Sequence, residues 1–278
     1  MKLEDKHQAF SNYFLILLIY ALFFISQTTS IAPVISVLIV FVGVITYMIK
    51  RSVSSPLIWW ALLLVLVCNF RYYLLANHYL LLMYMIFATA LYFTFSLNQK
   101  DFLLSVKYLG AAVMLTAGFQ KMMSPEFISG AYCYQMIHTG VFFNPIFRAF
   151  QFHTDEIRAN EQDLYHFIRS SHRFTGKLIF RELFRYVREF SIVFSWTIIL
   201  YEILLGCLLL YKPSWKGTHI LFVLLILGVF LTRPAEVGFL TLLSIIGLFL
   251  TKTNFCKMSY LILIAFLSSL ILTNQSMT

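Results

Sequence analysis

The residue with the clearest chemical potential in this sequence is Lys121, in the stretch LTAGFQKMMSPEFISGAYCYQ. It follows a long apolar run and the small-residue step Ala117-Gly118. A lysine near the end of a membrane span can be a simple anchor, with its stem in lipid and its amine in water. A lysine that is partly removed from water gives up its proton more readily and can serve as a base near neutral pH. Lys121 is therefore a candidate catalytic base, and an anchor is the alternative.

A second candidate is His78, which follows Asn77 at the start of the next apolar stretch toward the N-terminus. A histidine at a helix entry is often a capping or interface residue. The segments 78–97 and 102–123 are joined by a short loop, so the two helices should pack antiparallel. His78 and Lys121 would then lie at the same membrane face, where imidazole and amine could form an acid–base pair. We predict that they share one cavity open to the outer leaflet.

Three further ionisable groups stand in or beside apolar segments. Glu202 lies in the middle of SWTIILYEILLGCLLLY, where a lone carboxylate needs a partner or stays protonated, and its role is open between structure and function. Arg233 and Glu236 flank the TRPAE turn and either pair with each other or line the same mouth as Lys121. His219 is expected to be structural. The predicted substrate-binding set is therefore Asn77, Arg233, Glu236 and Glu202.

Soluble-enzyme and metal motifs are missing from the sequence. It contains no P-loop, no HExxH, no GxSxG and no CxxC, and its four cysteines have no metal-ligand spacing. No metal site is expected, and a disulfide between Cys68 and Cys133 stays open.

The composition indicates that these residues sit in a membrane protein. The chain has 278 residues, of which 60% are hydrophobic and only 12% are charged. An average soluble domain has about 25% charged residues. The formal charge of +9 is best explained by topology signals in loops rather than by nucleic acid binding.

Apolar segments close to the ~20 residues that cross a bilayer define the predicted fold class. It is an all-α polytopic bundle of nine spans, with eight as the alternative, and it forms a single transmembrane domain over residues 1–278. The expected spans are 13–31, 32–49, 57–76, 78–97, 102–123, 189–211, 217–232, 235–251 and 256–273.

The distribution of basic residues predicts the orientation in a plasma or inner membrane. With the N-terminus inside, the short inner segments carry Lys2, Lys6, Lys50, Arg51, Lys100, Lys212, Lys216, Lys252 and Lys257. The short outer segments carry only Arg71 and Arg233. Because short cytoplasmic loops are enriched in Lys and Arg, the N-terminus is expected inside and the C-terminus outside.

The same topology places the long segment 124–188 outside. Within it, GVFFNPIFRAF is apolar enough to lie on or dip into the membrane surface. The stretch that follows predicts one or two amphipathic helices in the interface, because apolar residues recur at helical spacing opposite basic ones. These residues are Phe180, Leu183, Phe184 and Val187, with Arg181, Arg185 and Arg188 opposite.

Two stretches, NHYLLLMYMIFATALYF (77–93) and TAGFQKMMSPEFISGAYCY (116–134), resemble the horizontally transferred transmembrane domain family, which includes the vitamin K-dependent gamma-glutamyl carboxylases. The similarity covers roughly residues 10–273. Its matching positions are Asn77, His78, Ala117, Gly118, Lys121, Phe127 and Gly130. THILFVLLILGVFLTRPAEVGFLTLL (218–243) is similar to the family's His-led span. In size the chain resembles compact bacterial members, including a membrane factor that matures a secreted killing peptide. A more distant likeness is to DoxX and MauE proteins.

The resemblance implies a membrane quinone such as vitamin K or menaquinone as cofactor, with Lys121 as the base that deprotonates its hydroquinone and His78 as helper. It also implies a small secreted peptide, and a protein encoded beside the chain, as partners. Gln120 stands where the carboxylases have a second basic residue, and their large luminal domain has no counterpart here, so the resemblance implies a carboxylase-like enzyme more than glutamate carboxylation itself.

These observations leave two leading functions open. One is an enzyme that matures a secreted peptide or acts on a quinone at the outer face, and the other is a non-catalytic subunit that binds and stabilises a partner. A transporter is less favoured because no inverted halves are visible. An enzyme needs Lys121 unpaired and reachable, whereas a scaffold would bury it against a carboxylate.

The topology makes a direct prediction. A single cysteine introduced near Asn160 should react with a membrane-impermeant maleimide in intact cells, because segment 124–188 lies outside. Labelling that appears only after the cells are opened would overturn the orientation.

Overall fold

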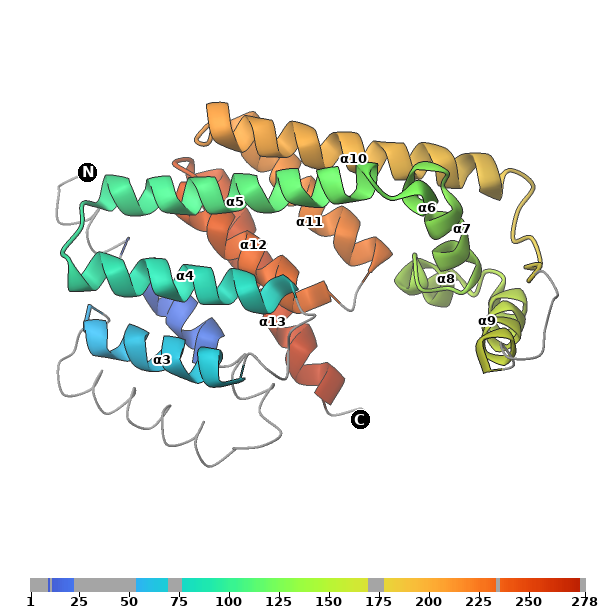
Figure 1. The fold of residues 1–278 in the computed structure, drawn as a ribbon, viewed down its shortest axis with the longest axis horizontal. Coiled ribbons are helices and arrows are strands. Elements are labelled where there is room, and N and C mark those ends of the chain that lie inside the picture. The colour runs from blue at the N-terminus through green and yellow to red at the C-terminus, as the bar shows by residue number, and fades with distance from the viewer. Residues whose placement is uncertain are drawn as a thin grey trace. The chain divides into compact units, whose positions relative to one another are not determined.

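A computed structural model describes residues 10, 12–22, 54–69, 77–169, 178–233 and 236–275 of the chain. Within these ranges the chain forms helices and no strand, which confirms the predicted all-α class (Figure 1).

The described helices coincide with the predicted apolar segments. Span 32–49 lies outside the described residues, as does the second half of span 13–31, whose first half is helical over Asn12–Leu22. The remaining spans correspond to α3 (Pro56–Asn69), α4 (Asn77–Thr94), α5 (Gln99–Met122), α10 (Val187–Tyr211), α11 (Lys216–Thr232), α12 (Val237–Leu250) and α13 (Asn254–Gln275).

Two of these helices, α5 and α10, are long and apolar enough to cross a membrane. The other apolar helical stretches among the described residues are 10–17 residues long, which is below the ~20 that a bilayer core requires. A bundle of eight or nine spans is therefore not confirmed, although two possible spanning helices are consistent with membrane association.

Helix α10 buries polar residues and exposes large apolar ones. Its buried face holds Ser191, Ser195 and Glu202 together with the apolar residues Val187, Ile199, Leu205 and Leu209. Large apolar side chains on its surface are exposed, among them Val193 at 67% and Leu200 at 60%. A helix that buries polar groups and exposes apolar ones is suited to a lipid solvent.

The chain divides into two compact units. The first comprises Met1–Gly110, Lys212–Val223 and Val237–Thr278, and α12 is buried along its whole length there. Gly247 of α12 faces the ring of Tyr260 on α13, so a side chain at this position would collide with the phenol. The hydroxyl of Tyr20 donates to the carbonyl of Gly238 at 2.8 Å, which ties the N-terminal helix to the start of α12.

The second unit comprises Ala111–Tyr211 and Leu224–Glu236. Four short helices fill the interval between α5 and α10, and we call them the helical cap. They are α6 (Pro125–Ile128), α7 (Ala131–His138), α8 (Asn144–Phe150) and α9 (Thr154–Arg169). The amphipathic helix expected in this region is present as α9, and the apolar GVFFNPIFRAF stretch supplies α8.

The second amphipathic helix, predicted over 180–188, does not form. Residues 178–186 have no regular secondary structure, and α10 begins only at Val187. The side chain of Asn160 binds both backbone groups of Arg181, accepting from its N–H at 2.7 Å and donating to its carbonyl at 3.0 Å. These groups would otherwise make helical hydrogen bonds, so a tertiary contact overrides the periodic pattern.

Because Asn160 is itself buried, the exposed Glu161 is a better position than Asn160 for the cysteine-labelling test of topology.

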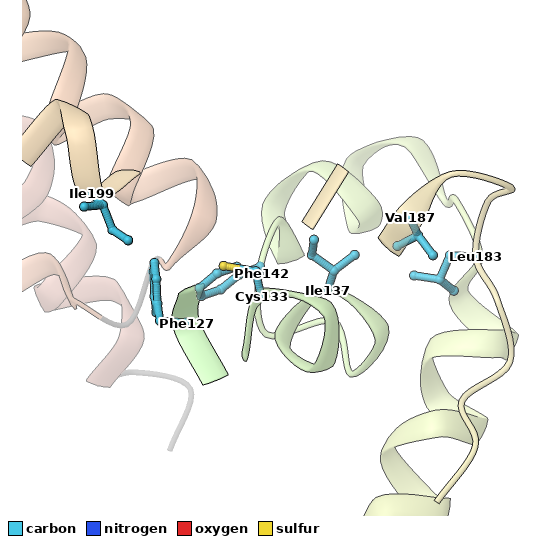
Figure 2. Packing of buried hydrophobic residues seen from close by; sticks show 7 residues of the cluster. All are labelled: Phe127, Cys133, Ile137, Phe142, Leu183, Val187 and Ile199. Atoms are coloured by element: carbon cyan, nitrogen blue, oxygen red, sulfur yellow. The ribbon is translucent and has the colours of Figure 1, made fainter. Parts of the chain in front are cut away.

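A row of buried side chains forms the core of the cap (Figure 2). Phe127 of α6 packs near Ile199 of α10 at one end, and Leu183 and Val187 pack near Ile137 of α7 at the other. The members of the row are Phe127, Cys133, Ile137, Phe142, Leu183, Val187 and Ile199. The cap is therefore attached to α10 by apolar contacts along its length.

Gly130 joins α6 to α7 in a conformation that other residues avoid. Its φ is +75°, in the left-handed region, and a Cβ here would lie 2.7 Å from the backbone nitrogen of Ile192. Both the turn and the close approach to α10 therefore require glycine.

We predict that Gly130→Ala lowers the free energy of unfolding by about 2 kcal/mol or more, since left-handed strain alone costs about 1–2 kcal/mol. Gly228→Ala is the matched control, because nothing lies within 4 Å of its Cβ position. That variant should be neutral or slightly stabilising in thermal unfolding of the detergent-solubilised protein. Equal stability of the two variants would contradict the close approach of α6–α7 and α10.

Candidate functional site

Helices α5 and α10 approach each other through two glycines. A Cβ on Gly118 of α5 would lie 2.7 Å from Ile203 of α10, and one on Gly206 of α10 would lie 2.6 Å from Leu115 of α5. The pairing of 115 with 206 and of 118 with 203 makes the helices antiparallel. Small residues permit such close packing between apolar helices, and they position the next residue of this seam, Lys121.

Lys121 forms an ion pair with Glu202. Its Nζ lies 2.7 Å from both carboxylate oxygens of Glu202, and 3.5 Å from the carbonyl oxygen of Ala117 one turn earlier. The Lys121 side chain is 28% exposed and that of Glu202 is 10% exposed. An ammonium has three N–H donors and no acceptor, and here there are three acceptors for them. The short contacts to both carboxylate oxygens give Glu202 the partner that its position requires.

Aromatic and sulfur groups of the cap lie next to the pair. The Nζ of Lys121 is 5.8 Å from the centre of the Phe127 ring, a cation–π distance. The thiol of Cys133 accepts a hydrogen bond from the hydroxyl of Ser195 at 3.0 Å, seven residues before Glu202 on α10. Burial raises the pKa of Cys133, which the Ser195 hydrogen bond and the charge of Lys121 partly oppose. The thiol is therefore kept protonated and unreactive.

The other predicted site residues occupy separate places. Arg233 pairs with Glu236 at 3.1 Å, which is the first of the two alternatives for the TRPAE turn. His78 and Asn77 begin α4 in the first unit, whereas Lys121 lies in the second, and the side chains of His78 and Asn77 fall outside the described residues. The predicted His78–Lys121 cavity therefore stays a prediction. His219 is buried with its Nδ1 3.0 Å from the hydroxyl of Tyr260, consistent with the expected structural role.

The cysteines and carboxylates of the described segments do not assemble a metal site. No group of three or more His, Cys, Asp or Glu side chains with metal-binding geometry occurs in this part of the chain. All four cysteines are free, so Cys68 and Cys133 form no disulfide.

The residues around Lys121 do not fit a quinol that must be deprotonated. A base presents its lone pair to the substrate, but the amine of Lys121 directs its three donors at Glu202 and at the carbonyl of Ala117. We therefore derive no step through a quinone at this position.

The chain matches no family model, no curated protein and no solved structure. The structure itself must therefore carry the functional argument.

The sequence marks both Lys121 and Glu202 as candidate site residues, but it does not predict that they bind each other. A signal for it was present: Ser191, Ser195 and Glu202 recur at i, i+4 and i+11 on an otherwise apolar helix, which places them on one face. That polar stripe marks the face of α10 that meets α5 and the cap.

The ion pair makes a prediction about stability. Glu202→Leu should lower the free energy of unfolding because it leaves Lys121 without its carboxylate. We expect a loss of about 1–3 kcal/mol, between the losses typical of breaking a surface ion pair and a buried one. The double variant Lys121→Leu with Glu202→Leu should recover most of this loss, since no buried charge remains. Thermal unfolding of the wild type, Glu202→Leu, Lys121→Leu and the double variant in the same detergent completes the cycle. Strictly additive losses would show that the two side chains do not interact.

Proposed function

We propose that this chain is a multi-pass membrane protein that binds and stabilises a peptide or protein partner, and that Lys121 is a structural cation rather than a catalytic base. The observation that carries this proposal is the engagement of the Lys121 amine by both oxygens of Glu202 and by the carbonyl of Ala117. The contact with a carboxylate supports the scaffold, although the Lys121 side chain is 28% exposed rather than buried.

Support for the membrane setting comes from α5 and α10. Both are long enough to span, and α10 exposes apolar side chains while it buries Ser195 and Glu202. In the proposed topology the N-terminus is inside, the C-terminus is outside, and the cap lies on the outer face. Because Lys121, next to last in α5, meets Glu202, the N-terminal part of α10 continues past the end of α5 and packs against the cap.

Exposed apolar residues on the cap support a partner-binding role. Phe150 is 65% exposed, Phe152 55%, Tyr165 51% and Ile168 61%, and all four lie outside the two candidate spans. The rings of Phe150 and Phe152 stack on each other at 5.7 Å. Exposed apolar groups that lie together, such as this stacked pair, are typical of a contact surface for another molecule. A small secreted peptide, or a protein encoded beside this one, is the partner class that we propose.

A catalytic role for Lys121 is the second candidate. One observation favours it: 28% of the Lys121 side chain remains exposed, so the amine is not sealed from a substrate. If the ion pair opened, the amine could act as the base that the family resemblance suggests.

The substitution Lys121→Arg separates the two functions. Arginine keeps the charge and can bind a carboxylate through two N–H groups, but it does not give up its proton in practice. We predict that Lys121→Arg retains at least half of the host's mature secreted peptide, measured by mass spectrometry of the medium and normalised to membrane protein level. Lys121→Ala should lose it together with much of the folded protein.

Lys100→Ala is the control, since Lys100 is an exposed lysine at the start of the same helix. It should behave as wild type. A Lys121→Arg protein that is folded and abundant but yields no mature peptide would establish the base and reject the scaffold.

A further inference from the structure

A buried imidazole in the cap has one ring nitrogen without a partner. His138, the last residue of α7, has no exposed surface. Its Nδ1 lies 2.8 Å from the carbonyl oxygen of Tyr134, to which it donates. A neutral imidazole carries one N–H, so Nε2 is the unprotonated nitrogen. No group in the described part of the chain makes a hydrogen bond to this Nε2.

Aromatic rings surround the imidazole. The ring of Phe180 stacks on it with centres 5.6 Å apart and planes 26° apart, and the ring of Tyr134 lies 4.0 Å away. Such faces accommodate a neutral, flat ring. The faces of these rings carry no oxygen or nitrogen that could accept a hydrogen bond from a protonated Nε2.

The stack holds one end of the irregular segment 178–186. Next to Phe180, the backbone of Arg181 is bound by the side chain of Asn160, whose amide also donates to the carbonyl of His138 at 3.2 Å. Leu183 then enters the apolar row of the cap (Figure 2). The segment has no regular secondary structure, so these contacts, together with the packing of Phe184 on Phe190 of α10, hold it in place.

We infer that His138 is a proton-sensitive latch: protonation of Nε2 expels the imidazole from its stack with Phe180 and releases residues 178–186 from the cap. The Lys121–Glu202 pair takes no part in it, so the latch does not depend on the proposed function.

Charged and titratable neighbours modify this response without removing it. Glu182, on the latched segment itself, is the carboxylate that favours the protonated imidazole, and Tyr134 is the titratable neighbour on α7. The face of α9 toward α7 presents Asn160 and Ile157, which carry no charge. Burial lowers the pKa of His138, whereas the bond to the Tyr134 carbonyl and the charge of Glu182 oppose the shift.

The sign of the pH effect follows from that lowered pKa. Above the ordinary histidine pKa of about 6.5 the imidazole is neutral whether latched or released, and the latch has its full strength. As the pH falls below this value, the released form takes up a proton more readily than the latched form. The latch therefore weakens in acid.

Hydrogen exchange at the amide of Arg181 tests the latch, because this N–H donates to Asn160. The full-length protein in lipid nanodiscs is compared at pH 7.5 and pH 5, with each rate divided by the intrinsic rate of an unstructured chain. We expect the protection factor of the Arg181 amide to be about tenfold lower at pH 5 than at pH 7.5. The largest possible decrease is about 30-fold, which applies if the released imidazole has a pKa of about 6.5 and the latched imidazole takes up no proton at pH 5.

Three variants decide between the latch and a general acid effect. His138→Phe keeps the ring stack and cannot titrate, so Arg181 should stay protected at both pH values. Glu182→Gln removes the opposing charge and should enlarge the acid loss. His166→Gln, an exposed histidine on α9, is the control and should respond as wild type.

The latch is rejected if protection of Arg181 is the same at both pH values in the wild type, or if His138→Phe shows the full acid loss. If His138→Phe fails to fold, the Glu182→Gln protein decides: an acid loss no larger than that of the wild type rejects the latch, and a larger one supports it.

Discussion

The second unit of this protein is organised around one ion pair between two apolar helices. A single charge in the interior of a spanning helix costs about 2.5–3.5 kcal/mol on insertion scales, so Glu202 within α10 is favoured to meet the amine of Lys121 in the last turn of α5. For Lys121 to reach both oxygens of Glu202, α5 and α10 must lie close together, and Gly118 and Gly206 permit this approach. The same face of α10 then presents Ser195 to the cap. The glycine contact between α5 and α10, the Lys121–Glu202 ion pair and the contact of Ser195 with the cap therefore all involve the same buried face of α10.

The cap continues this arrangement along the N-terminal part of α10. Apolar contacts from Phe127 to Leu183 attach it to α10, and Asn160 fixes a stretch of chain that has no regular structure. It also combines a rigid core with exposed aromatic residues such as Phe150. In our proposal the cap holds a partner, while the buried imidazole of His138 makes one of its segments responsive to acid.

Much of the helical framework could be predicted from hydrophobic periodicity, because α5 and α10 begin and end within a few residues of the predicted segments. The helix expected over 180–188 was wrong, since the pattern of apolar and basic residues contains no information about Asn160, which lies twenty residues away. Lys121 and Glu202 each stood out as polar groups in apolar surroundings, but their partnership is a contact over 81 positions that spacing alone does not reveal. Local patterns predict elements, whereas buried polar contacts depend on the tertiary fold.

Exchanging the two charges is the most direct test of the central claim that Lys121 serves as the partner of Glu202. Lys121→Glu and Glu202→Lys each place two like charges at the seam, and their combination restores opposite charges in reversed order. The account predicts that both single variants lose folded protein and melting temperature, and that the double variant melts clearly above either of them. A double variant that melts no higher than the single variants would contradict it, because the two charges would then act independently.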